Sequence, residues 1–200
     1  MNYILASVIG YLLGSIPFAL VIGKVFYKVD IREHGSGNLG GTNAGRTLGK
    51  EAGIAVTVFD VLKAAIAMMI TMTFSYDAMI YAGFFATIGH CFPIFAKFKG
   101  GKAVSTAFGF LLSVSIFITK NPLLHFVLPL AIFFASLYLT KLVSLSSMIA
   151  VTFAAIVLAL TQNDMRVTLA MAIIAMIVIV RHRANIGRIR RGEERKITWM

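Results

Sequence analysis

The chain has 200 residues, of which 58 % are hydrophobic and 14 % are charged, and its mean hydropathy is +0.86. This composition excludes an ordinary soluble globule, and apolar runs that recur along the whole chain indicate a polytopic membrane protein. The formal net charge of +11 does not favour nucleic-acid binding, because the basic residues cluster at the ends of apolar runs, where membrane topology alone places them.

Seven apolar segments are candidate membrane spans. They cover residues 3–27, 52–74, 78–96, 103–119, 123–140, 147–161 and 167–180. The first has no basic leader region and no small-residue cleavage site, so we expect it to be retained as a helix, kinked at Pro17. The last two are short for a span of about 20 residues, so five or six crossings are alternatives to seven. The expected fold is an all-α integral membrane protein with about seven transmembrane helices, forming a single domain over residues 1–200.

The distribution of basic residues predicts the orientation in the membrane. With seven crossings, one side carries most of the lysines and arginines together with the C-terminal tail, and the other side carries only Lys120 and Arg166. The positive-inside rule then places the N-terminus outside and the C-terminus in the cytoplasm. Three polar stretches, at residues 29–51, 97–102 and 181–200, fall on the cytoplasmic face in this arrangement.

The first polar stretch contains Gly35–Arg46, with the sequence GSGNLGGTNAGR. Glycines reach positive φ at low cost and can direct several N–H groups at one anion, while Thr42, Asn43 and Arg46 add further donors. The G-x-G-x-x-G spacing is weak evidence for a dinucleotide site, because a membrane helix precedes it instead of a strand. An ordered anion-binding loop is favoured over a flexible cytoplasmic loop, which is the alternative.

Two charged residues lie within the second span. Asp60 and Lys63 are three positions apart and therefore share a helix face. Charges at membrane depth are costly and are usually paired or face a cavity. This pair either locks helix packing alone, or it directs Lys63 toward a phosphate with Asp60 orienting it.

The second polar stretch is the cytoplasmic end of a longer motif, GHCFPIFAKFKGGK, which covers Gly89–Lys102. His90 is either a structural hydrogen-bonding group or a general base. Cys91 is the only cysteine, which excludes a disulfide framework and a cysteine-based metal cluster, and it is expected to be a buried hydrophobe. Lys99 and Lys102 flank a glycine pair, which favours a second anion pocket over positive-inside charge alone.

The third polar stretch is the basic tail that begins at Arg181. It could serve as an interfacial segment that binds acidic lipid head groups. Asn185 and Glu194 do not fit that role well, so the tail is also a candidate part of a functional site.

Together, the three stretches resemble the signature motifs of the bacterial acyl-phosphate:glycerol-3-phosphate acyltransferases of the PlsY type. The first motif matches Gly35-Ser36-Gly37-Asn38, Gly40, Thr42-Asn43 and Arg46; the second matches Gly89-His90, Phe92-Pro93, Phe95 and Phe98-Lys99-Gly100-Gly101-Lys102; the third matches His182-Arg183, Asn185-Ile186, Arg188, Gly192, Glu194 and Lys196. The opening GYLLGSIPF and the Asp60–Lys63 pair also resemble this family. Gly41 and Ser105 stand where alanine is common, and neither departure removes a donor or a charge.

The resemblance implies transfer of a fatty acyl group from acyl phosphate to the sn-1 hydroxyl of glycerol 3-phosphate, giving lysophosphatidate and phosphate for phospholipid biosynthesis. It implies a multi-pass protein of the bacterial inner (cytoplasmic) membrane, with a soluble acyl-phosphate-producing enzyme as a candidate partner. No metal cluster is legible in the sequence, and we expect no cofactor and no nucleic-acid partner. The residues expected to take part in catalysis are Ser36, Arg46, His90, Asn185 and Glu194. The residues expected to bind substrate phosphates are Gly35, Gly37, Asn38, Gly40, Thr42, Asn43, Lys63, Lys99, Gly100, Gly101, Lys102, His182, Arg183 and Arg188.

Two points of mechanism and the function class itself have alternatives at this stage. The general base is His90, His182 or a substrate phosphate, and direct displacement is favoured over a covalent acyl-Ser36 intermediate. A transporter of anions or lipids, and a scaffold that recruits soluble lipid-synthesis enzymes, are the alternatives from other classes. No internal repeat of the kind that many transporters carry is visible in the sequence.

Overall fold

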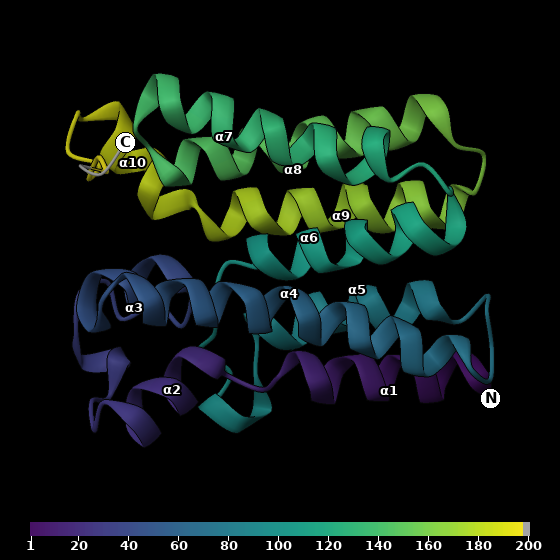
Figure 1. Cartoon of the computed structure of the whole chain (residues 1–200), viewed down its shortest axis with the longest axis horizontal. Helices are drawn as coiled ribbons and strands as arrows, with labels where there is room; N and C mark the ends of the chain where they lie inside the picture. Colours follow the sequence, from purple (N-terminus) through teal and green to yellow (C-terminus); the bar gives the residue numbers. More distant parts are fainter. Residues whose placement is uncertain (198–200) are drawn as a thin grey trace. The chain divides into compact units, whose positions relative to one another are not determined.

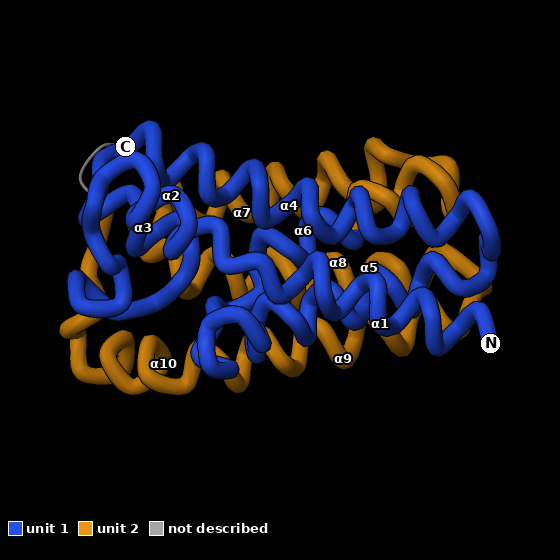
Figure 2. Tube along the Cα trace, turned by 90° about the horizontal axis from the view of Figure 1, so that it is seen from below, with its two compact units in different colours: residues 1–110 blue, residues 111–200 orange. Residues whose placement is uncertain are grey.

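The computed structural model describes residues 1–197, which form helices joined by short loops, without a strand in that range (Figure 1). The chain divides into two compact units, Met1–Phe110 and Leu111–Met200, which Figure 2 draws in different colours. The boundary falls inside α6 (Val104–Ser113). The first two polar stretches belong to the first unit, and the described part of the third belongs to the second unit.

The first unit is built from α-helices and two short 3-10 helices. In chain order these are α1 (Asn2–Gly14), α2 (Phe18–Phe26), η1 (Ile31–Glu33), α3 (Gly41–Leu48), α4 (Lys50–Met72), α5 (Met79–Cys91), η2 (Ile94–Ala96) and the start of α6. The kink expected at Pro17 is a complete break between α1 and α2. Proline has no N–H to donate and its ring obstructs the preceding turn, so the helix hydrogen bonds are interrupted there.

Small residues let α1 and α5 approach each other closely. A Cβ atom on Gly10 or on Gly14 would lie 2.1 Å from the carbonyl oxygen of Ala82 or Ala86, respectively. Lipid tails give little hydrophobic drive for helix association, so close backbone packing of this kind provides much of the contact energy in membrane bundles.

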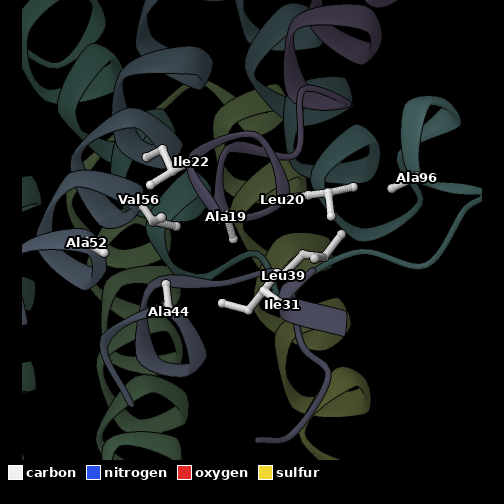
Figure 3. Packing of buried hydrophobic residues seen from close by; sticks show 9 residues of the cluster. All are labelled: Ala19, Leu20, Ile22, Ile31, Leu39, Ala44, Ala52, Val56 and Ala96. Carbon is white, nitrogen blue, oxygen red and sulfur yellow. The ribbon is translucent and has the colours of Figure 1, made fainter. Parts of the chain in front are cut away.

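The glycine-rich stretch rests on a small apolar core. Figure 3 shows this core, which contains side chains from α2, η1, α3, α4 and η2 and includes Leu39 and Ala44 of the stretch itself; the nine buried residues are Ala19, Leu20, Ile22, Ile31, Leu39, Ala44, Ala52, Val56 and Ala96. Helix α3 was expected as part of a loop, and it forms because Ala44 and Leu48 share a face that packs against this core. The stretch is therefore an anchored structure.

The second unit begins with the end of α6 and contains two π-helical turns, η3 (Val114–Ile118) and η4 (Leu123–Val127). It continues with α7 (Leu128–Thr140), α8 (Val143–Thr161), α9 (Met165–Arg181) and α10 (Arg183–Arg190). Helix α8 begins four residues before the predicted start at 147. The hydroxyls of Ser146 and Ser147 donate to the carbonyls of Leu142 and Val143, so these serines are satisfied inside the helix.

Five helical segments within residues 1–197 are long and apolar enough to cross a membrane. They are Asn2–Phe26, Lys50–Met72, Met79–Ala96, Leu123–Thr140 and Val143–Thr161. Helices α9 and α10 meet at a bend of 55° and would provide a sixth span if they are counted together, while Val104–Ile118 is apolar but shorter. All seven predicted segments are helical, whereas the number of crossings and the orientation of the termini stay predictions.

Candidate active site

The glycine-rich loop turns sharply at Ser36. The residues on either side, Gly35 and Gly37, have φ angles of 61° and 67°, a region that residues with a Cβ atom rarely occupy. The buried side-chain amide of Asn43 stabilises this turn by hydrogen bonds to the loop backbone. Its Oδ1 accepts from the Ser36 N–H at 2.9 Å, and its Nδ2 donates to the carbonyls of Ile31 and His34 at 3.3 and 3.2 Å.

The side chain of Asn43 is thus occupied by the loop backbone. We expected this residue among the phosphate-binding groups, and its position makes any contribution to a ligand act through the Ser36 turn. The Ser36 hydroxyl is exposed, and none of the described residues hydrogen-bonds to it. Arg46 is exposed and lies one turn after Asn43 on α3. The loop therefore presents a hydroxyl and a guanidinium from one anchored segment.

Two basic residues near the end of α2, Lys24 within its last turn and Arg32 in η1, are engaged in ion pairs. The Arg32 guanidinium and the Lys24 ammonium both contact the Asp30 carboxylate, with the lysine nitrogen at 3.2 Å. The hydrogen bond from the Arg32 side chain holds the pKa of Asp30 well below its usual range, and it outweighs the burial that would raise it. Lys24 and Arg32 are therefore paired with Asp30 at the edge of the glycine-rich loop.

The charged pair in α4 is buried and makes a cluster with His90 of α5. The Lys63 Nζ lies 2.7 Å from Asp60 Oδ1, 3.0 Å from His90 Nδ1 and 3.0 Å from the carbonyl oxygen of Ile16. The Lys63 and Asp60 side chains are 3 % and 1 % exposed. An ammonium has three N–H donors, and this one has three protein acceptors, so the geometry favours a structural pair over a lysine that reaches for phosphate.

The second polar stretch folds back on the end of α5. The N–H groups of Gly100 and Gly101 donate to the carbonyls of Cys91 and His90 at 3.2 and 3.0 Å. We expected these two amides to bind substrate, and in this conformation they close the turn instead. Lys99 is exposed just before the turn and Lys102 is half-buried just after it. The side chains of these lysines are the groups that the turn offers to an anion.

In the second unit, Glu194 is the centre of a polar cluster. Its Oε1 accepts from the Ser144 hydroxyl at 2.8 Å and from Asn185 Nδ2 at 2.6 Å, and its Oε2 accepts from Arg188 Nε at 2.6 Å. The glutamate ties α10 and the segment after it to the start of α8. Sequence reasoning paired Asn185 with Glu194 but missed Ser144, because 50 residues separate it from the glutamate.

The remaining tail residues have different environments. His182 is buried, and its Nδ1 lies 2.7 Å from the carbonyl oxygen of Val178 one turn earlier. Arg183 is exposed and Arg188 is half-buried beside the glutamate. Thr198, Trp199 and Met200, at the end of the predicted stretch 181–200, lie outside the described residues.

Glu194→Gln is expected to destabilise the second unit by about 2 kcal/mol, because the neutral amide loses charge-assisted hydrogen bonds. Burial raises the pKa of Glu194, but hydrogen bonds from Asn185, Ser144 and Arg188 outweigh it and lower the pKa below the ordinary value of 4.5. A lowered pKa gives stabilisation that is fully present above pH 4.5 and is lost as the pH falls through the folded-state pKa.

Thermal unfolding of wild type and Glu194→Gln in detergent at several pH values measures this effect. The difference between the two proteins should be largest near neutral pH and should shrink under acidic conditions. Glu193→Gln is the matched control, because Glu193 is exposed and its one ion pair within residues 1–197 is with exposed Arg191. An equal difference for Glu194→Gln at all pH values would contradict the charge-based account.

Comparison with known proteins shows which family the chain belongs to. A family model described as glycerol-3-phosphate acyltransferase matches residues 4–192. The chain belongs to the glycerol-3-phosphate acyltransferase family. It is 50 % identical over 204 residues to the glycerol-3-phosphate acyltransferase of Listeria monocytogenes serovar 1/2a, covering 100 % of this chain and 99 % of the relative. It is 48 % identical over 196 residues to that of Bacillus cereus strain G9842, covering 98 % and 95 %.

Two solved structures of PlsY (YgiH), described as an integral membrane glycerol 3-phosphate acyltransferase, have the same fold. Its glycerol 3-phosphate form matches with a TM-score of 0.90 at 33 % identity, and covers 99 % of this chain and 96 % of that one. Its lysophosphatidic acid form matches with a TM-score of 0.88 at 32 % identity and the same coverage.

Membership of the glycerol-3-phosphate acyltransferase family confirms several expectations from the sequence. The chain is an acyltransferase, as the three motifs predicted, and an all-α, multi-pass integral membrane protein, as the apolar segments predicted. The roles of individual residues, the acyl donor and the hydroxyl that is acylated are treated as proposals below.

Proposed function

We propose that this enzyme transfers a fatty acyl group from acyl phosphate to the sn-1 hydroxyl of glycerol 3-phosphate. The hydroxyl oxygen bonds to the acyl carbon, the bond from that carbon to the phosphate oxygen breaks, and inorganic phosphate leaves with lysophosphatidate as the product. The proton from the hydroxyl passes to a base. Family membership supports glycerol 3-phosphate as the acceptor, and the choice of donor follows from the motif resemblance.

The observation that carries the proposal is the Ser36 turn. A mixed anhydride already has a good leaving group, so the enzyme needs orientation and charge stabilisation more than a strongly activated nucleophile. An exposed hydroxyl on an anchored glycine turn suits that task. Ser36 would hydrogen-bond at the reacting centre, and Arg46 would hold the phosphate of the acyl donor.

The second set of anion donors would serve glycerol 3-phosphate. Lys99 and Lys102, which flank the turn in the first unit, are the donors proposed for this role. In the second unit, Arg183 and Arg188 are a separate pair of candidate phosphate-binding residues. Asn185 and Glu194 would order the segment that carries the arginines. A substrate phosphate is one group that can accept the hydroxyl proton.

The proposed location is the cytoplasmic membrane of a bacterium, with the polar stretches facing the cytoplasm. Acyl chains are apolar and can stay among the membrane helices, whereas both phosphates require a polar site at the membrane surface. A soluble enzyme that produces acyl phosphate remains a candidate partner on the cytoplasmic loops, and we expect no metal or other cofactor.

The test uses purified full-length protein in detergent with labelled glycerol 3-phosphate and palmitoyl phosphate. Appearance of lysophosphatidate and phosphate in equal amounts is the expected result. Palmitoyl thioester in place of palmitoyl phosphate tests the donor. Well-folded protein that forms no product from either donor would overturn the proposal, and uptake of glycerol 3-phosphate into vesicles would then favour a transporter. Product formation without a membrane gradient excludes transport as the explanation.

A further inference from the structure

The buried cluster of Asp60, Lys63 and His90 has no part in the reaction proposed above, although it lies beneath the second polar stretch. We propose that these three residues are a positioning cluster, which fixes the Gly100–Gly101 turn and thereby Lys102, and that His90 transfers no proton during acyl transfer. The inference rests on the proposed function, since it concerns the placement of a substrate-binding lysine.

The cluster is electrically balanced. One carboxylate and one ammonium lie 2.7 Å apart, and the imidazole nitrogen lies 3.4 Å from the same carboxylate oxygen. Removing either Asp60 or Lys63 alone would leave an uncompensated charge in the interior, which costs far more than removing both. An ammonium that donates to His90 Nδ1 also requires the tautomer with its proton on Nε2.

Lys63 connects the cluster to the break in the first span. The carbonyl of Ile16 lies at the gap between α1 and α2, where the helix hydrogen bonds are interrupted, and it accepts from Lys63 Nζ at 3.0 Å. The ammonium also lies 5.8 Å from the centre of the Phe18 ring. Three segments, the α1–α2 break, α4 and α5, are thereby held at one buried point.

His90 passes this constraint on to the turn. A Cβ atom on Gly101 would lie 2.0 Å from His90 Nε2, and one on Gly100 would lie 2.0 Å from the His90 carbonyl oxygen. The glycine backbone therefore packs directly on the ring, and its N–H groups bond to the end of α5. Movement of the ring would move the turn, and Lys102 is the next residue after it.

The same geometry argues against proton transfer by His90. Its side chain is 5 % exposed, its Nδ1 faces Lys63 and Asp60, and its Nε2 faces the backbone of Gly101. A general base must reach the hydroxyl that it deprotonates, directly or through one water molecule. Each ring nitrogen here faces a group of the protein.

The experiment compares variants of the full-length protein by initial rates over a range of glycerol 3-phosphate concentrations and pH values. His90→Leu should raise the KM for glycerol 3-phosphate about tenfold, because displacement of a binding group by a fraction of an ångström weakens its contact. His90→Asn should restore a KM within about twofold of wild type, because asparagine keeps an acceptor near the Nδ1 position. Its pH profile should match wild type.

Variants at the charged pair test the electrostatic part. Asp60→Asn and Lys63→Met should each raise KM and lower thermal stability, and the double variant should lie nearer to wild type than either single variant. If Asp60→Asn or Lys63→Met fails to fold, the KM values of His90→Asn and of the double variant test the inference. His125→Asn is the matched control, because His125 is also buried and bonds two threonines, yet it belongs to the second unit.

The possible outcomes distinguish a positioning role from a proton-transfer role and from a purely structural role. Loss of one limb of the pH profile in His90→Asn would identify His90 as a proton-transfer group and overturn the inference. Lowered stability with unchanged KM in all variants, as expected for His125→Asn, would reduce the cluster to a structural role and also overturn it. Wild type without acyl transfer would refute the proposed function instead, whatever the variants do.

Discussion

Ser36→Ala is expected to reduce lysophosphatidate formation to background while leaving the protein folded. The hydroxyl is exposed and has no partner among the described residues, so its removal breaks no hydrogen bond of the fold. Loss of one donor at the centre of a reaction typically costs a factor of about 100 to 1,000 in kcat. Initial rates with palmitoyl phosphate and labelled glycerol 3-phosphate measure the effect, and thermal unfolding checks the fold.

Ser7→Ala is the matched control for this variant. Ser7 lies in the same unit, and its hydroxyl donates to the Tyr3 carbonyl one turn earlier in α1. We expect Ser7→Ala to keep wild-type rates. Wild-type activity in Ser36→Ala would remove this hydroxyl from the mechanism, and an acylated Ser36 in donor-treated wild type, seen by mass spectrometry, would replace direct displacement by a covalent route.

Asn43→Asp should lower kcat/KM about 100-fold, because a displaced reacting group loses its orientation. One carboxylate oxygen can still accept from the Ser36 N–H. The other takes the place of Nδ2 and faces the carbonyls of Ile31 and His34, so a donor is replaced by a negative charge opposite two acceptors. Leaving these buried acceptors without a donor costs about 1–3 kcal/mol. We expect the Ser36 turn to change its conformation in response.

A double-variant cycle shows whether Asn43 acts through Ser36. In a Ser36→Ala background, Asn43→Asp should have little further effect on the rate, since the hydroxyl that it positions is gone. Asn163→Asp, the same change at an exposed residue outside the turn, should retain wild-type activity. Additive losses in the cycle would assign Asn43 a contact with substrate of its own, as the sequence first suggested.

Hydropathy predicted the membrane helices well, because an apolar run of sufficient length has few other stable forms. The short helices α3 and α10 were missed, since polar residues and glycines dominate the stretches in which they occur. Their formation depends on packing: Ala44 is buried against residues that lie elsewhere along the chain. The early start of α8 was missed for a related reason, because serine suggests a loop until its hydroxyl has a carbonyl to bind.

For the candidate site, sequence reasoning identified residue types better than residue partners. Asp60 and Lys63 were recognised as a pair from their spacing, but nothing in the spacing indicated the Ile16 carbonyl or His90 as further partners. Asn43 looked like a ligand-binding amide because a loop rich in donors suggests an anion. Whether an amide faces the ligand or its own backbone depends on φ angles at Gly35 and Gly37, which the sequence permits without specifying.

The placement of Asp60 and Lys63 on one helix also bears on how the protein enters the membrane. Helix α4 has 23 residues, and each of these side chains alone would add about 2.5–3.5 kcal/mol to the cost of inserting a helix centre. Partners three residues apart on one helix meet as soon as that helix forms, before α5 has been synthesised. We therefore expect α4 to enter the membrane with these two central charges already paired, and His90 to complete the cluster once α5 packs against α4.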